Sequence, residues 1–198
     1  MKYINQLEFS DIPYVTNCGM EWEEKEKGKA TTVRSSGCGL CCAIMVLDRL
    51  VPDYVFDLKD AVKLSYDCGA NHIGGTDYER FAPKFAEKFG LELEMSNDAE
   101  RLTYCLRTGG AAVILVKGDR DGYVGVFGHN EHYVAAISEE RDGRIAVLDP
   151  SYIPGKYEEE GRKGLVEMKN SFIALCDIQV IINDTVLPKP CFYLFWRK

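Results

Sequence analysis

The sequence lacks long apolar runs. No stretch reaches the roughly 18 consecutive apolar residues that a membrane-spanning helix needs. Residues 1–11 contain Lys2 and Asp11 but no apolar segment of the roughly 7–15 residues found in a secretory signal. We therefore expect a cytoplasmic protein without a membrane partner, in which the cysteines are reduced thiols.

Basic side chains are also scarce. The chain has 24 Lys and Arg against 31 Asp and Glu, which gives a net charge of −7. Neutralising a phosphate backbone needs a basic face, so we expect no nucleic-acid partner. The apolar fraction of 46% is too high for a disordered chain. A length of 198 residues fits one domain, and we expect a single domain over 1–198.

Cysteine is too rare for a disulfide scaffold. Such scaffolds carry roughly 8–10% Cys, whereas this chain has 8 Cys in 198 residues and 3 His. A chain of this length can bury a core without disulfide bonds, so the cysteines are considered for the reactivity of their thiols. Each thiol is therefore judged by whether its neighbours would make it reactive.

Periodicity predicts helices in the first half and strands in the second. Apolar residues at helical spacing predict helices over 37–50, 57–66, 76–89 and 98–107. Alternating or continuous apolar runs predict strands over 91–95, 111–116, 132–137, 145–148, 173–182 and 191–196. Residues 1–36 are expected to be extended and irregular, with a weak strand over 31–37, and 151–164 to form a long exposed loop. Segregated helices and strands indicate an α+β fold.

Cys38 has the neighbours of a reactive thiol. Small residues surround it, and a predicted helix begins at or just before it. The free N–H groups and the dipole at a helix N-terminus stabilise a thiolate, and flanking glycines let a substrate approach the sulfur. Cys41 and Cys42 follow within the helix and are expected in the core or near the site.

His132 is the favoured base for this thiol. It heads an apolar strand, and residues 141–144 (Arg-Asp-Gly-Arg) predict a hairpin turn to the next strand, which ends in Asp149-Pro150. The end of the second strand of a hairpin lies near the start of the first. Asp149 is therefore expected beside His132, where it would orient the ring. His129 is a weaker alternative base.

These motifs resemble a known family. The segments Gly37-Cys38-Gly39-Leu40-Cys41-Cys42-Ala43, His132-Tyr133-Val134 and Asp149-Pro150 are similar, in this order, to the papain-fold cysteine peptidases of the bacteriocin-processing type. These are also called double-glycine leader peptidases, and they have stand-alone relatives. The resemblance spans roughly residues 12–150. Leu40 departs from the family, which often has Pro there.

The resemblance implies a papain-like fold, with an N-terminal helical half packed on a C-terminal antiparallel sheet. It implies that Cys38 is the nucleophile, His132 the general base and acid, and Asp149 the orienting acid. It also implies cleavage of a peptide or protein substrate without a metal or organic cofactor. Stand-alone relatives carry a Gln where Asn17 stands, so Asn17 is the expected oxyanion donor and Gln6 a weaker candidate.

Three other functions remain open from the sequence. Cys38 and Cys41 form a C-x-x-C motif at a helix start, as in thiol–disulfide oxidoreductases, although no β–α–β pattern surrounds it. His129, His132 and a pair of thiols offer ligands for zinc, although their spacing matches no standard finger. A catalytically inactive peptidase-like protein that binds peptides is the third alternative.

Overall fold

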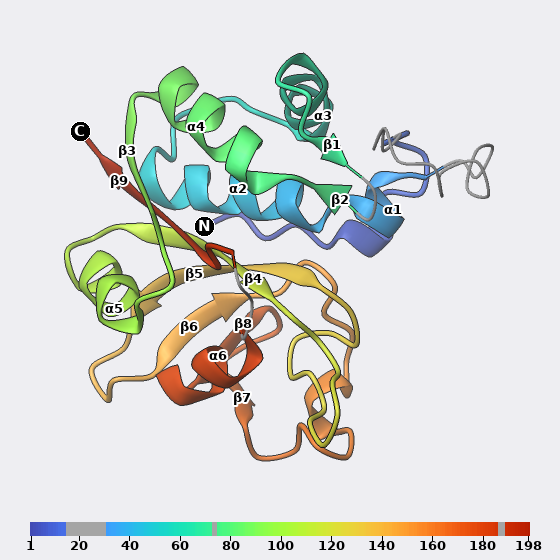
Figure 1. Cartoon of the computed structure of the whole chain (residues 1–198), viewed down its shortest axis with the longest axis vertical. Helices are drawn as coiled ribbons and strands as arrows, with labels where there is room; N and C mark the ends of the chain where they lie inside the picture. The colour runs from blue at the N-terminus through green and yellow to red at the C-terminus, as the bar shows by residue number, and fades with distance from the viewer. Residues whose placement is uncertain (15–30, 73–74, 186–188) are drawn as a thin grey trace.

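A computed structural model describes residues 1–14, 31–72, 75–185 and 189–198. Its main feature is an antiparallel seven-stranded sheet with the strand order β3-β9-β4-β5-β6-β8-β7 (Figure 1). The strands are β3 Leu91–Ser96, β4 Ala111–Val116, β5 His132–Glu139, β6 Ile145–Leu148, β7 Val166–Met168, β8 Ile173–Cys176 and β9 Phe192–Arg197. A two-stranded hairpin is formed by β1 Asn71–His72 and β2 Gly75–Thr76.

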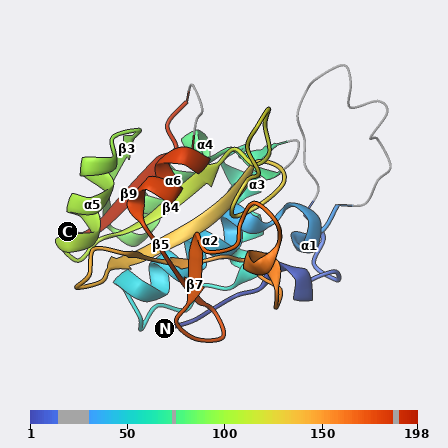
Figure 2. The same ribbon diagram turned by 90° about the horizontal axis from the view of Figure 1, so that it is seen from below.

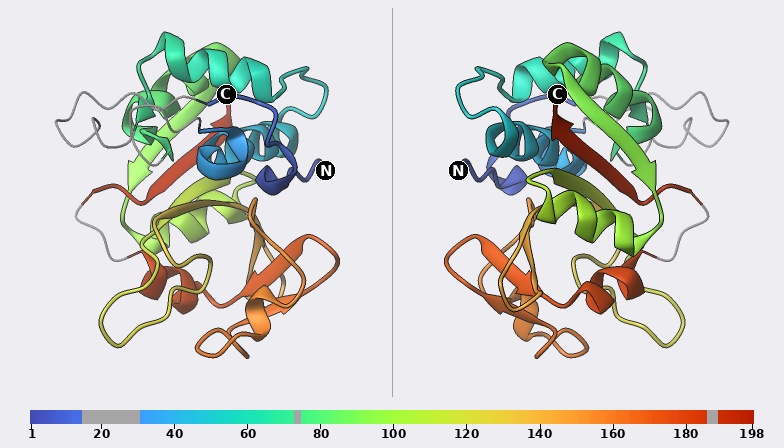
Figure 3. Two further views of the ribbon diagram at one scale, coloured as in Figure 1. Left: turned by 90° about the vertical axis from the view of Figure 1, so that its right-hand side faces the viewer. Right: turned by 90° about the vertical axis from the view of Figure 1, so that its left-hand side faces the viewer.

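Helices cover both faces of the large sheet. The helices of the described residues are α1 Val33–Ser36, α2 Cys38–Leu50, α3 Leu58–Asp67, α4 Tyr78–Phe89, α5 Ala99–Arg107 and α6 Ile178–Asp184, with short 3-10 turns η1 Gln6–Glu8 and η3 Lys156–Glu158. Helices α1 to α4 form the upper layer in Figure 1. Seen from below, α6 lies in front of the strands (Figure 2), and the side views keep the N-terminal helices above β6 to β8 (Figure 3). The mixed α+β architecture is therefore confirmed.

Strand β4 shows why two apolar cores form. All six of its residues are buried. Because side chains alternate between the two faces of a strand, Val113 and Leu115 join the core beneath α2 and α4, while Ile114 and Val116 join the core beneath α5 and α6. A continuous apolar run is what a strand covered on both faces requires.

Side-chain caps fix where the helices begin. Asp57 Oδ1 accepts the Lys59 N–H at 2.8 Å at the start of α3. Asp77 and Asp98 cap α4 and α5 in the same way. These bonds satisfy backbone donors that have no partner within the helix. Helix α4 contains Pro83 yet begins at Tyr78, so the proline does not delay its start.

Two strand predictions were wrong. Only Ile173–Cys176 of the expected 173–182 strand is extended, and α6 follows after Asp177. The helical turn buries Val180 and Ile181 and directs the Asp184 carboxylate to the Val126 and Phe127 N–H groups.

The expected weak strand over 31–37 is instead the single turn α1. Ser35 Oγ accepts the Thr32 N–H at 3.1 Å, which favours a helix start over an extended strand. Residues 1–14 and 31–36 are therefore less irregular than expected, since η1 also lies in this part of the chain.

The expected exposed loop over 151–164 is confirmed for most of its residues, but three of them are buried. These are Lys156, Tyr157 and Arg162, and the short turn η3 lies within the segment. Arg162 Nε donates to the Gly125 carbonyl at 2.8 Å, so this segment packs against the loop before β5. Long polar side chains are buried here because each finds a hydrogen-bond partner.

None of the helices in the described part of the chain combines the length and apolar character needed to cross a bilayer.

Candidate active site

Cys38 is the first residue of α2 and opens onto a cavity. Gly37 is the helix N-cap, and the Cys38 side chain is 7% exposed. The cavity has a volume of about 570 Å³, and besides Cys38 its lining residues include Ser35, Thr76, Tyr78, Glu79, Glu131 and Tyr193. As the first residue of a helix, Cys38 has a backbone N–H without an intrahelical partner. The Cys38 thiol and the first N–H of α2 thus lie at one wall of the cavity.

Gly39 allows the start of α2 to pack closely against two tyrosines. A Cβ at this position would lie 2.8 Å from Tyr78 Cε2 and 3.2 Å from Tyr133 Cδ2. Tyr78 OH donates to the Gly39 carbonyl at 2.7 Å, which ties the start of α4 to the start of α2. Gly39 is therefore required by the packing beside the Cys38 thiol.

His132 lies between Cys38 and Asp149. It is the first residue of β5 and pairs with Val116 of β4. Its Nε2 lies 2.9 Å from Asp149 Oδ1 and 3.1 Å from Ser151 Oγ, and the Cys38 thiol lies close enough for each of the two side chains to shift the pKa of the other. Because Nε2 faces Asp149, Nδ1 is the nitrogen left for Cys38. The structure thus brings together the three residues that the sequence assigned to a triad.

The β5–β6 hairpin produces this proximity. The Glu140 N–H donates to the Arg144 carbonyl at 2.8 Å, and Gly143 takes a positive φ of 84° that favours glycine. The register places Leu148 opposite Ala135. Asp149 follows Leu148 directly and therefore lies at the same end of the hairpin as His132, as the turn predicted.

The site favours a thiolate and an imidazolium. Burial alone raises the pKa of Cys38, but hydrogen bonds from His132, the His132 charge and the Tyr133 and Gly39 N–H groups outweigh it and lower the pKa. Burial alone lowers the pKa of His132, but Asp149 and Cys38 raise it to about 9. Burial also works against ionised Asp149, yet His132 and Lys156 hold its pKa well below the usual range. Opposite charges thus stabilise one another in this buried row.

Sequence reasoning missed two side chains that hold Asp149. Lys156 Nζ lies 2.6 Å from Asp149 Oδ2, and Tyr157 OH donates to the same oxygen at 2.8 Å. Ser151 adds its N–H to Oδ1 at 2.9 Å. The sequence offered one weak signal, a Lys-Tyr pair seven and eight residues after Asp149, but its acidic surroundings suggested a solvated loop.

The N-terminal segment holds the backbone of the same corner. Tyr3 OH donates to the Asp149 carbonyl at 2.8 Å, and the Gln6 N–H donates to the Pro150 carbonyl at 2.7 Å. The Gln6 Nε2 donates to the Arg34 carbonyl at 2.9 Å. Because that amide is engaged elsewhere, the geometry does not support Gln6 as the oxyanion donor. Asn17 lies outside the described residues, and its assignment stays a prediction.

The other candidate histidine is placed differently. His129 Nδ1 lies 2.9 Å from Asp119 Oδ2, and the His129 side chain is largely exposed. Of the two histidines, His132 is therefore the one that lies beside Asp149. Over residues 1–14, 31–72, 75–185 and 189–198, no group of three or more His, Cys, Asp or Glu side chains is placed to share a metal ion.

Cys41 and Cys42 are fully buried thiols in the core beneath α2. Burial, reinforced by the nearby negative charge of Cys38, raises the pKa of Cys41 well above its usual value. The second cysteine of a redox pair must ionise to resolve a mixed disulfide. This environment therefore disfavours Cys41 in that role.

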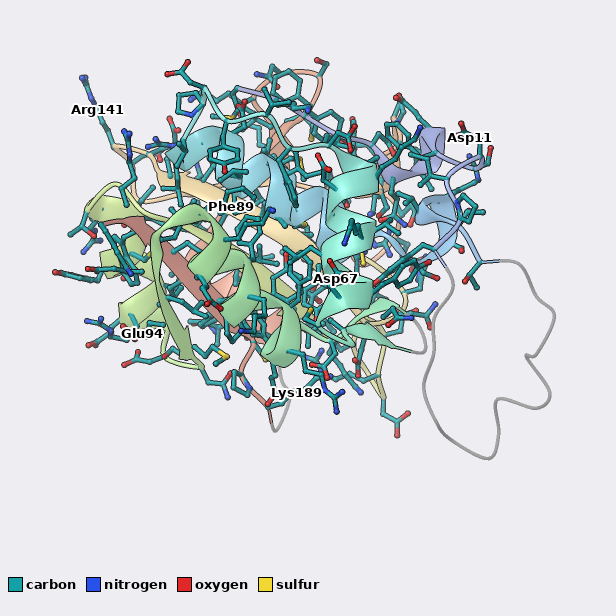
Figure 4. All side chains as sticks on the ribbon, turned by 90° about the horizontal axis from the view of Figure 1, so that it is seen from above. Asp11, Asp67, Phe89, Glu94, Arg141 and Lys189 are labelled. Carbon is teal, nitrogen blue, oxygen red and sulfur yellow. The ribbon has the colours of Figure 1, made fainter. Side chains whose placement is uncertain are left out.

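The charged side chains that line the cavity include a paired lysine and an exposed glutamate. Lys189 Nζ lies 3.4 Å from Glu131 Oε2, so the lysine at this wall is paired, and Figure 4 labels it at the edge of the molecule. Glu79 lies in the first turn of α4 and is exposed on the same cavity. Its carboxylate is expected to give this entrance a negative potential.

No protein-family model matches the chain, and no curated protein does so.

Proposed function

We propose that the protein is a cysteine peptidase-like hydrolase that cleaves a peptide or related amide bond. The observation that carries the proposal is the row Cys38–His132–Asp149 beside a cavity of about 570 Å³. A thiol at a helix N-terminus facing a histidine at the start of an antiparallel strand also supports a papain-like fold. A nucleophile, a base beside it and a group that orients the base are the arrangement that acyl transfer through a covalent intermediate requires.

The first chemical step forms an acyl-enzyme. The Cys38 thiolate attacks the substrate carbonyl carbon and forms a C–S bond, and the electron pair of the carbonyl moves onto oxygen. The Cys38 N–H is placed to stabilise that oxyanion, and Asn17 is the expected second donor. Collapse breaks the C–N bond, and the His132 imidazolium gives its proton to the departing amine.

The second step releases the product. Neutral His132 takes a proton from water, and the resulting hydroxide adds to the thioester carbon. The C–S bond then breaks, which restores the Cys38 thiolate and the His132 imidazolium and releases a carboxylic acid. Asp149 stabilises the imidazolium and keeps its ring oriented throughout.

The cavity lining supports a peptide-like substrate. The exposed Asn130 lines the cavity with a side-chain amide, and Tyr78, Tyr133 and Tyr193 line it with aromatic rings. A side-chain amide both donates and accepts hydrogen bonds, as the amide groups of a peptide require. The surrounding aromatic rings offer apolar surface to a side chain.

A peptidyl epoxide tests this function, because its ring opening needs a thiolate and a proton donor. We expect one covalent adduct on Cys38 at neutral pH, mapped by mass spectrometry of tryptic peptides. Cys38→Ala and His132→Ala should remove it, whereas Cys41→Ser should keep it. An adduct that survives in Cys38→Ala, or no adduct on the wild type, would overturn the proposal. Disulfide exchange that Cys41→Ser abolishes would favour the oxidoreductase instead.

A further inference from the structure

Lys156 is a buried cation next to the orienting acid of the site. Its side chain is 7% exposed, and that of Asp149 is 1% exposed. The Lys156 Nζ donates to Asp149 Oδ2 at 2.6 Å and to Ser151 Oγ at 2.8 Å. Removing a lysine from water is costly unless it is paired, so this placement needs a reason beyond chain packing.

The two oxygens of Asp149 have separate partners. Oδ1 faces His132 Nε2 at 2.9 Å and also accepts from the Ser151 N–H and hydroxyl groups. Oδ2 accepts from Lys156 and from Tyr157 OH. Rotation of the carboxylate would break both sets of bonds. Lys156 therefore helps to fix the edge of Asp149 that faces the imidazole.

The charges alternate along one buried row. Cys38 and Asp149 carry negative charge when ionised, and His132 and Lys156 carry positive charge. Without Lys156, the row would hold one excess negative charge, and Asp149 would bind the His132 proton more tightly. A more tightly held proton is transferred less readily to a leaving amine, because proton transfer follows the difference in acidity.

Other titratable groups near the row keep their protons. Burial raises the pKa of each of these groups, which come from the N-terminal segment, α2, α4, β5 and η3: Tyr3, Cys41, Cys42, Tyr78, Tyr133 and Tyr157. They therefore add no charge near neutral pH. Among the described residues that contact Asp149, Lys156 is the cation that opposes its pull on His132.

We propose that Lys156 is a positioning residue of this site, which fixes the Asp149 carboxylate and weakens its hold on the His132 proton. The inference rests on the proposed roles of Cys38, His132 and Asp149. It assigns a function to a segment that the sequence marked as a solvated loop. In this arrangement the Asp149 carboxylate is shared between the His132 imidazolium and the Lys156 ammonium group.

The test is an NMR titration of the full chain labelled with 13C in histidine. The chain has 3 His, so His72→Gln and His129→Gln variants assign the His132 signal. Lys156→Met should raise the pKa of His132 by about one unit or more, the usual effect of one neighbouring charge. Lys156→Arg keeps the charge and should restore a value near that of the wild type.

Tyr157→Phe is the matched control, because it removes a hydrogen bond from the same Asp149 oxygen without removing a charge. Its shift should be clearly smaller than that of Lys156→Met. If Lys156→Met does not fold, Lys156→Gln replaces it, since its amide can still donate to Asp149 without carrying a charge. An unchanged or lowered His132 pKa in the neutral variants would overturn the inference, as would an equal shift in Tyr157→Phe.

The same titration separates this inference from the proposed function. If the wild-type His132 titrates near the ordinary histidine value of about 6.5 and its pKa does not change in Cys38→Ala, both the role of Lys156 and the proposed function are overturned. If the pKa of His132 is raised in the wild type and falls in Cys38→Ala, but does not change when the charge of Lys156 is removed, only the role of Lys156 is overturned.

Discussion

His132 Nε2 lies 2.9 Å from Asp149 Oδ1, and both residues lie at one end of the β5–β6 hairpin. The contact leaves Nδ1 of the ring for Cys38, which approaches from the N-terminus of α2. A strand start, a strand end and a helix start thus supply the three groups. Because none of them depends on a long side chain crossing a loop, the site is built on regular elements.

Asp149→Asn should lower the pKa of His132, because it removes the negative charge that stabilises the imidazolium. Asp149 and Cys38 together raise the pKa of His132 to about 9, so loss of the carboxylate should move that pKa down toward the ordinary value of about 6.5. Epoxide opening requires protonated His132, and the high-pH limb of the rate profile of inactivation should therefore shift to lower pH by about one unit or more. An unmoved high-pH limb would contradict the role of Asp149.

The buried pair Lys156–Asp149 should be strongly coupled in stability. Asp149→Asn leaves the Lys156 charge buried without its counter-ion and should lower the free energy of unfolding by about 3–5 kcal/mol. Urea unfolding of the two single variants and of Asp149→Asn/Lys156→Met should show a coupling of about 1–3 kcal/mol. Asp67→Asn removes an exposed partner of Lys63 and should change the stability little. Strict additivity in the buried pair would contradict the account.

Gly39→Ala tests the close packing beside the nucleophile. Alanine favours a helix, but its Cβ would lie 2.8 Å from Tyr78 Cε2. We expect a net loss of about 1–3 kcal/mol in urea unfolding, because overpacking outweighs helix propensity. The epoxide reaction of Cys38 should also slow. A stabilised variant with wild-type reactivity would show that the tyrosines move aside freely.

Glu79 should control which charged reagents reach Cys38. Iodoacetate and iodoacetamide have similar size but differ in charge, so the ratio of their alkylation rates reports the local potential. Glu79→Lys should raise the iodoacetate to iodoacetamide ratio several-fold at low salt, and added salt should reduce the effect. Glu100→Lys is the control, since Glu100 is also exposed in the first turn of a helix. Equal changes in both variants would argue against a local effect at the cavity.

Local sequence signals were sufficient for most elements and for the proximity of His132 and Asp149. An Asp before an amphipathic segment marks the start of α3, α4 and α5, because its side chain caps the helix. The turn at residues 141–144 fixed the register that joins His132 to Asp149. Cys38 was found because its helix start and its small neighbours are adjacent in the sequence.

The misses arise where distant contacts decide the outcome. Residues 178–182 are apolar enough for a strand, and helix formation there depends on packing in the core beneath α6. Lys156 is buried because Asp149 and Ser151 meet it in space. A charged segment in the sequence gives no sign of such pairing, so the sequence predicts that its side chains are exposed to solvent.

The pairing of Cys38 with His132 is tested most directly by the rate of Cys38 alkylation by iodoacetamide as a function of pH, measured on the wild type and on His132→Ala. We expect the wild-type thiol to ionise below the ordinary thiol value of about 8.5, because His132 lowers the pKa of Cys38. In His132→Ala the burial of Cys38 is no longer opposed by the imidazolium, so the apparent pKa should rise. Identical profiles for the two proteins, each with the pKa of an ordinary thiol, would contradict the claim that Cys38 and His132 form a reactive pair.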